Sequence, residues 1–170
     1  HMFMDVFAAM DEGREPMELL DEVQRQYEKG HGVRIITLKA RQMGISTLIE
    51  AIGFQLSFLI PRMRGLVLAH DADSSRGLLQ MCHTYWETFW AKDLYTPKWA
   101  SEARMAWVEP MSQLMVGTAG NENTGRSRTI HFLHASEVAM WAKAEGLMTS
   151  LRQSIPPSMA NTFIFKESTA

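Results

Sequence analysis

The sequence predicts an α/β fold: a mainly parallel sheet flanked by helices. Short β-branched or apolar runs alternate along the chain with longer segments whose apolar residues recur at helical spacing. Several of these runs end in polar residues, which is typical of parallel strands whose carboxyl ends form a ligand-binding edge. We therefore expect the chemistry of this protein at the strand ends.

The individual elements follow from these patterns in chain order. Segments with helical periodicity and capping residues predict helices at 15–29, 46–59, 71 to about 90, and 144–153. Short apolar runs predict strands at 33–38, 65–70, 105–108, 113–116, 130–134 and 162–166. The strands at 105–108 and 113–116 flank a turn and predict a hairpin. Residues 92–102 show no regular pattern, so an irregular segment is expected there.

Composition sets limits on the class of protein. The chain has 170 residues, of which 46% are hydrophobic and 21% charged, as expected for one globular domain. No apolar run reaches the roughly 18 residues of a membrane span. The single cysteine, Cys82, excludes an internal disulfide, and the six histidines lack metal-ligand spacing. The net charge of −2 indicates no basic DNA-binding balance over the whole chain, so a DNA contact would need a local patch, another part or a partner.

The segment LKARQMGIST has the context of a phosphate-binding loop, because it follows the strand at 33–38 and opens the helix at 46–59. Alignment on Gly44 puts Ser46 at the hydroxyl position that binds Mg²⁺, followed by Thr47. The usual lysine position is Ile45, whereas Lys39 stands at the first glycine position.

The two cations of this loop are both suited to phosphate. Lys39 is long enough to reach β- and γ-phosphates, and Arg41 offers a planar fork of donors. The alternative is a polar turn with two solvated cations.

The strand at 130–134 leads into Ser136-Glu137. A Walker B strand usually ends in Asp-Glu, where the aspartate serves the metal and the glutamate orients the attacking water. Glu137 keeps the position of the water-orienting carboxylate, which is a central requirement of phosphoryl transfer. Ser136 replaces the aspartate and can contact a metal only weakly or through water. The alternative is that both residues cap the segment that follows.

These motifs resemble those of the N-terminal ATPase domain of tailed-phage terminase large subunits. KARQMGIST is similar to their variant Walker A motif, in which an R-Q-x-G core precedes hydroxyl residues and some members carry the lysine at the start of the loop. SEVAMW is similar to a Walker B variant of the same family. The resemblance implies an ATP site formed by Lys39, Arg41, Gln42, Gly44, Ser46 and Thr47, with Ser46 and Ser136 at the metal and Glu137 at the water.

The resemblance extends to two further segments. Ser168-Thr169-Ala170 resembles the coupling motif, whose hydroxyl pair senses the γ-phosphate. An arginine finger supplied to a neighbour's site is implied before Walker B; Arg126 matches that position best and Arg128 is the alternative. Either arginine could instead be a solvated loop residue. The related P-loop branch implies that the strand at 162–166 lies between those at 33–38 and 130–134.

The implied function is Mg²⁺-dependent ATP hydrolysis that drives DNA packaging into procapsids. The implied cofactors are ATP and Mg²⁺. The implied partners are double-stranded DNA, further copies in a homo-oligomeric ring, a portal protein and a small terminase subunit, in the cytoplasm of the infected bacterial host and without membrane contact. Residues 1–32 are expected to comprise an expression scar and a helix, and residues 33–170 an ATPase core lacking the nuclease domain, so nuclease activity is not expected. Another P-loop helicase or translocase core, or a nucleotide-binding scaffold with little turnover, are the alternatives.

Overall fold

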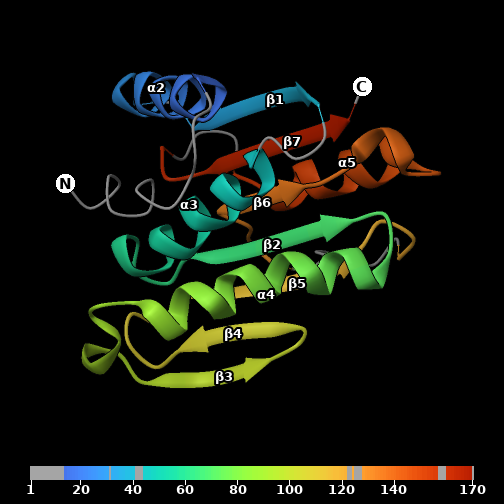
Figure 1. The fold of residues 1–170 in the computed structure, drawn as a ribbon. Coiled ribbons are helices and arrows are strands. Elements are labelled where there is room, and N and C mark those ends of the chain that lie inside the picture. Colours follow the sequence, from blue (N-terminus) through green and yellow to red (C-terminus); the bar gives the residue numbers. More distant parts are fainter. Residues whose placement is uncertain are drawn as a thin grey trace.

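The computed structural model describes residues 14–30, 32–40, 44–121, 124, 128–156 and 160–169. Figure 1 shows a single twisted sheet with helices on both faces. The helices are α2 (Arg14–Glu28), α3 (Ile45–Leu59), α4 (Ala72–Thr88) and α5 (Ala144–Ser154), with short 3₁₀ turns η1 (Lys92–Leu94) and η2 (Val138–Met140). The strands are β1 (Val33–Lys39), β2 (Arg64–Ala69), β3 (Pro97–Ser101), β4 (Arg104–Trp107), β5 (Gln113–Thr118), β6 (Phe132–Ala135) and β7 (Phe163–Thr169).

The strand order is β1-β7-β6-β2-β5-β4-β3. The first five strands in this order run parallel, and β4 and β3 continue the sheet antiparallel. The insertion of the last strand between β1 and β6 confirms the predicted topology, and the β4–β5 pair confirms the predicted hairpin. Parallel order brings the carboxyl ends of β1, β7 and β6 to one edge of the sheet.

The strand β7 is longer than the sequence predicted. It pairs with β1 as far as Lys39↔Thr169, whereas its pairing with β6 ends at Ala135↔Lys166. The prediction that Ser168 and Thr169 follow the strand was therefore wrong, because the backbone of β1 continues to offer hydrogen bonds to them. As a result, the last three residues of β7 project past the end of β6.

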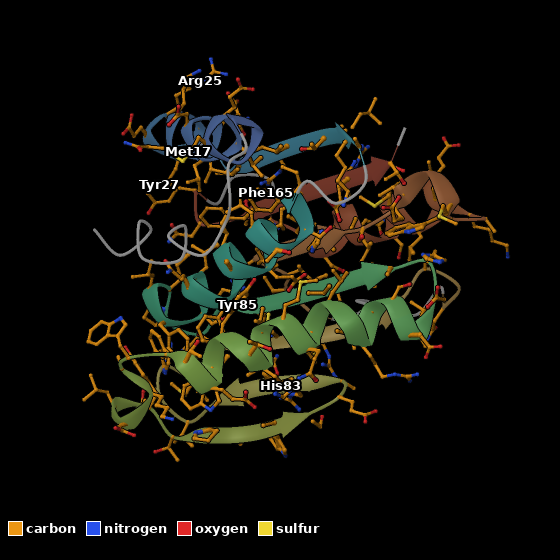
Figure 2. All side chains as sticks on the ribbon, in the orientation of Figure 1. Met17, Arg25, Tyr27, His83, Tyr85 and Phe165 are labelled. Carbon is orange, nitrogen blue, oxygen red and sulfur yellow. The ribbon has the colours of Figure 1, made fainter. Side chains whose placement is uncertain are left out.

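The two faces of the sheet carry separate apolar layers. On one face, α2, α3 and α4 cover side chains such as Val67, Phe132 and Phe165, whereas α5 covers Leu133 and Ile164 on the other. Alternate residues of each strand thus point to opposite layers. In Figure 2, Phe165 lies between β7 and α3.

The helix α3 lies unusually close to the centre of the sheet. A Cβ atom on Gly53 would lie 2.6 Å from the ring of Phe132 on β6, so a side chain here would push helix and strand apart. Most of α3 is buried, including its polar residues Glu50, Gln55 and Ser57. Close packing therefore brings a charged side chain of α3, that of Glu50, down onto the sheet.

One segment differs from the sequence-based expectation. Residues 92–102 are not irregular, because Pro97–Ser101 form the edge strand β3, which pairs antiparallel with β4. All five residues of β3 are exposed, so no alternation of apolar and polar residues marked the strand. Among the described residues, no helix is long and apolar enough to cross a membrane.

Candidate functional site

The phosphate-loop candidates lie where β1 ends and α3 begins. Lys39 is the last residue of β1, and Gly44 precedes α3 with φ 72°, a left-handed conformation that favours glycine. Ser46 lies in the first turn of α3. The N–H groups of a helix's first turn lack intrahelical acceptors and favour an anion. Arg41 and Gln42 lie outside the described residues.

The centre of the site is a carboxylate that was not assigned a role from the sequence, that of Glu167 on β7. Its Oε1 atom accepts hydrogen bonds from the hydroxyls of Ser46 (2.7 Å) and Ser136 (2.9 Å). Its Oε2 atom pairs with the ammonium of Lys39 at 2.8 Å, and Lys39 also donates to Ser46 Oγ at 2.6 Å. One buried carboxylate thus joins Lys39 and the hydroxyls of both predicted motifs.

A fully buried ionic chain lies behind Glu167. His134 Nε2 lies 3.1 Å from Glu167 Oε1, and His134 Nδ1 lies 2.5 Å from Glu50 Oε1. Cys82 Sγ donates to Glu50 Oε2 at 3.2 Å. The chain therefore links α4, α3, β6 and β7 beneath the site.

Protonation states follow from these contacts. Burial raises the pKa of Glu167, but the hydrogen bond and charge of His134, then the bonds from Lys39 and Ser46, lower this pKa to about 2. Burial lowers the pKa of His134, but the hydrogen bonds and charges of Glu167 and Glu50 raise it to about 9. At neutral pH, His134 is therefore a buried cation and Glu167 a carboxylate.

The second carboxylate of the site, that of Glu137, is tied to the end of β7. Its Oε2 atom accepts hydrogen bonds from the hydroxyl of Thr169 (2.6 Å) and from the Thr169 amide (2.9 Å). Although burial raises the pKa of Glu137, these two bonds and the charge of Lys39 lower it overall. The backbone of Glu137 has φ 53°, a left-handed conformation that is rare outside glycine and is found disproportionately at active sites.

Two of the predicted serines, Ser136 and Ser168, are buried. The amide of Ser136 donates to the Leu68 carbonyl at 2.8 Å, and the Ser136 carbonyl accepts from Trp141 Nε1 at 3.0 Å. These bonds fix the backbone of Ser136 so that its hydroxyl faces Glu167. Ser168 Oγ lies 3.4 Å from the amide of Ala139 in η2.

The described candidates mostly converge, as expected. The residues that meet at this edge of the sheet are Lys39, Gly44, Ser46, Ser136, Glu137, Ser168 and Thr169. Thr47 follows in the first turn of α3, where its carbonyl accepts the Tyr85 hydroxyl at 2.9 Å. In Figure 2, Tyr85 of α4 lies beside α3. Arg126 lies outside the described residues, and Arg128 contacts Met115 of β5 with Nη1 2.9 Å from Sδ.

Three functional candidates were missed from the sequence: Glu167, His134 and Glu50. Their spacing from neighbouring residues in the strands and the helix could have identified them. Glu167 follows Phe163 and Phe165 at spacings of two and so points to the same face, as His134 does after Phe132. Glu50 lies four residues after Ser46 and so shares its side of α3.

Other parts of the described chain give less evidence of a functional site. No group of three or more His, Cys, Asp or Glu side chains in the described ranges is arranged to hold a metal ion. A surface hollow of about 1030 Å³ beside α5 is lined by residues such as Arg128 and Arg152 and by none of the residues that meet at the β1–β7–β6 edge. The concentration of buried charge, and not a surface hollow, distinguishes the β1–β7–β6 edge.

Comparison with solved structures finds the same fold in ATPase domains of a phage large terminase. The Thermus phage P74-26 large terminase ATPase domain matches with a TM-score of 0.59 and 17% identity, over 92% of this chain and 68% of that one. An arginine-to-alanine mutant of that domain matches with a TM-score of 0.58 and 16% identity, over 92% of this chain and 69% of that one. No protein-family model matches the chain, and neither does any curated protein sequence. At this level of identity the similarity establishes the fold.

Proposed function

We propose that this chain is the ATP-hydrolysing motor domain of a phage large terminase, which drives DNA into procapsids. The observation that carries the proposal is the convergence of Lys39, Ser46 and Glu137 at one edge of a sheet with this fold. Lys39 and Ser46 both contact Glu167 on β7. Glu137 accepts a hydrogen bond from Thr169 on the same strand.

Nucleotide binding would start at the phosphate loop. The Lys39 ammonium is at the end of a long side chain with several rotatable bonds and would leave Glu167 to contact the β- and γ-phosphates. Gly44 would allow the close turn, and the first turn of α3, with Ser46 and Thr47, would present N–H groups to the anion. Arg41 and Gln42 would add donors from the same loop.

The oxygen-rich site fits Mg²⁺. Magnesium prefers hard oxygen ligands and keeps several waters, and the hydroxyls of Ser46 and Ser136 are neutral oxygens of this kind. The Lys39 ammonium lies between Ser46 and Glu167, and this placement supports a cation position at this point. Ser46 would bind the ion directly and Ser136 through water. Bound Mg²⁺ would neutralise the charge that develops on the phosphates.

Hydrolysis would depend on Glu137. Its lowered pKa leaves a carboxylate at neutral pH, able to accept a hydrogen bond from the attacking water and orient it. Because Thr169 donates both its hydroxyl and its amide to Glu137, a displacement of β7 would change the position of this carboxylate. Ser168 and Thr169 would thereby couple loss of the γ-phosphate to movement of the chain.

The remaining parts of the motor are proposed from the family resemblance. Arg126 would act in the site of a neighbouring copy within a ring, with Arg128 as the alternative. Double-stranded DNA, a portal protein and a small terminase subunit would be the partners, in the cytoplasm of the infected bacterium. Hydrolysis per chain should then rise as the protein is concentrated into oligomers, by up to about 10³–10⁵-fold where a finger is completed. A rate per chain that stays flat through assembly would count against Arg126 as a finger.

The main test is Glu137→Gln, which keeps the shape of the side chain and removes its charge. We expect ATP hydrolysis to fall by about 10²–10⁴-fold, with ATP binding retained. The matched control is Glu87→Gln on the exposed side of α4, which should hydrolyse at the wild-type rate. Wild type that binds ATP but hydrolyses no faster than Glu137→Gln, even in oligomers, would favour the nucleotide-binding scaffold. Hydrolysis stimulated by single-stranded but not double-stranded DNA would favour a helicase core.

A further inference from the structure

The strand β6 lacks the acidic residue that its position calls for. Ser136 stands where a Walker B strand usually carries aspartate, and a neutral hydroxyl cannot balance the charge of a divalent cation. Among the described side chains, the carboxylate bonded to the metal-site hydroxyl of Ser46 is that of Glu167. The negative charge beside Ser46 therefore comes from the neighbouring strand β7.

The strand register explains how Glu167 reaches this position. Ala135 on β6 is opposite Lys166 on β7, so Glu167 lies beside Ser136 on the adjacent strand. Neighbouring strands are about 4.8 Å apart, and glutamate is one methylene longer than aspartate. The Ser136 hydroxyl donates to Glu167 Oε1 at 2.9 Å, which places that oxygen within one hydrogen bond of the missing aspartate's position.

The two carboxylate oxygens of Glu167 have different partners. Several donors fix Oε1, whereas the single cation on Oε2 can be replaced. Oε1 accepts from Ser46, Ser136 and His134, whereas Oε2 is paired with the Lys39 ammonium. The bond from His134 is backed by Glu50, so the carboxylate remains oriented if Lys39 leaves. A purely structural ion pair would not require the hydroxyls of both nucleotide-binding motifs on the same oxygen.

We infer that Glu167 supplies the acidic group of the Mg·ATP site, in place of the aspartate absent at Ser136, and that Lys39 occupies this cation position in the nucleotide-free chain. This inference rests on the proposed function. With Mg·ATP bound, the Lys39 ammonium would contact the phosphates, and Ser46 and Glu167 would hold the divalent ion. The buried carboxylate has a cationic partner in both states, and the lysine becomes available only as the metal arrives.

The experiment measures metal and nucleotide binding separately. Affinity for a fluorescent ATP analogue is measured in excess EDTA, and Mn²⁺ affinity is measured by electron paramagnetic resonance with a non-hydrolysable ATP analogue present. Glu167→Gln should weaken Mn²⁺ binding by about 10–100-fold, because the charged partner of the metal is removed. In EDTA it should bind the nucleotide as tightly as wild type or more tightly, because Lys39 is released. Glu87→Gln should match wild type in both measurements.

A second variant tests whether a carboxylate at position 136 can replace that of Glu167. Ser136→Asp added to Glu167→Gln returns the carboxylate to β6, and Mn²⁺ affinity should recover toward the wild-type value. Mn²⁺ affinity that stays low in a double variant that still binds nucleotide in EDTA would count against the inference. So would nucleotide affinity in EDTA that falls in Glu167→Gln, since the carboxylate would then support the loop and not the metal.

The two proposals fail in different ways. If the wild-type chain binds no ATP analogue with or without Mg²⁺, the proposed function is wrong. If wild type binds the analogue and Mn²⁺, and Glu167→Gln keeps the wild-type Mn²⁺ affinity, the function stands and the role of Glu167 is wrong.

Discussion

The half of the sheet formed by β1, β7 and β6 buries acidic and basic side chains, whereas the half that contains β4 and β5 is covered by aromatic rings. In the first half, Glu50, His134 and Glu167 are at most 1% exposed and bonded in series. In the second, Phe54 and Phe58 of α3 pack against Trp107 of β4 with ring centroids 6.0 and 4.8 Å apart. Both halves share α3, so one helix carries charge toward one side and rings toward the other.

The difference indicates where function lies. Burying a charge costs free energy that a pair of opposite charges only partly recovers, and apolar replacements of such pairs are often no less stable. Aromatic packing stabilises the fold without such a cost. The buried charges of the ionic half are therefore better explained by chemistry at the strand ends than by a contribution to stability. The packing of the aromatic half is explained by stability alone. The following substitutions test this contrast.

The largest effect is expected from His134→Leu. It removes the cation between Glu50 and Glu167, so that Glu50 is buried without its charged partner and Glu167 is paired with Lys39 alone, which should cost about 3–5 kcal/mol of unfolding free energy. It should also weaken nucleotide-dependent Mn²⁺ binding, since Glu167 loses its support. Urea unfolding and paramagnetic resonance give the two readouts. Adding Glu50→Gln should recover part of the stability; a His134→Leu variant as stable as wild type would refute the ionic account of this half.

In the aromatic half, Trp107→Ala should lower the unfolding free energy by about 3–5 kcal/mol while leaving the site unchanged. Trp107 is 2% exposed and contacts the rings of Phe54, Phe58 and Trp86. Its matched control is Trp90→Ala, since Trp90 is 75% exposed and should contribute within about 0.5 kcal/mol. Nucleotide affinity is measured well below the melting temperature. A large loss of affinity in folded Trp107→Ala would show that the halves are not separable.

Lys39→Ala should weaken ATP binding by about 1.5–3 kcal/mol, or roughly 10–150-fold, because a charged hydrogen bond to phosphate is lost. Lys92→Ala, which removes an exposed lysine from η1, is the control and should bind as wild type does. Binding is measured by fluorescence titration at constant ionic strength. Equal affinities for wild type and Lys39→Ala would remove the phosphate loop from the proposal.

The smallest effect is expected from Tyr85→Phe, at the junction of the two halves. The Tyr85 hydroxyl donates to the Thr47 carbonyl in the first turn of α3, while its ring packs against Phe54. Loss of this one bond should cost about 0.5–1.5 kcal/mol of stability. Because the aromatic packing remains, thermal unfolding should shift slightly, and any change in ATP affinity should be small. A severe loss of affinity would instead make Tyr85 part of the phosphate loop's support.

Local sequence patterns predicted most of the fold. The strand at 33–38 and the helix at 46–59 depend on neighbouring residues in the chain, and the structure has both within one or two residues of the predicted bounds. The edge strand β3 was missed because all its side chains are exposed and its strand conformation depends on pairing with β4. The extension of β7 was missed for a similar reason, since partner backbone and not local composition sets where pairing ends.

By itself, the sequence determined the α/β class and predicted Lys39, Ser46 and Glu137 as candidate site residues at the strand ends, because spacing and strand-loop-helix context are local properties. Only the tertiary structure decided that Glu167 is the charged centre of the site. Its partners Lys39, Ser46, Ser136 and His134 lie between 31 and 128 positions away along the chain. They meet because β7 inserts between β1 and β6 and because Gly53 lets α3 approach Phe132. A carboxylate acquires its role from what surrounds it, and that is set by packing between distant segments.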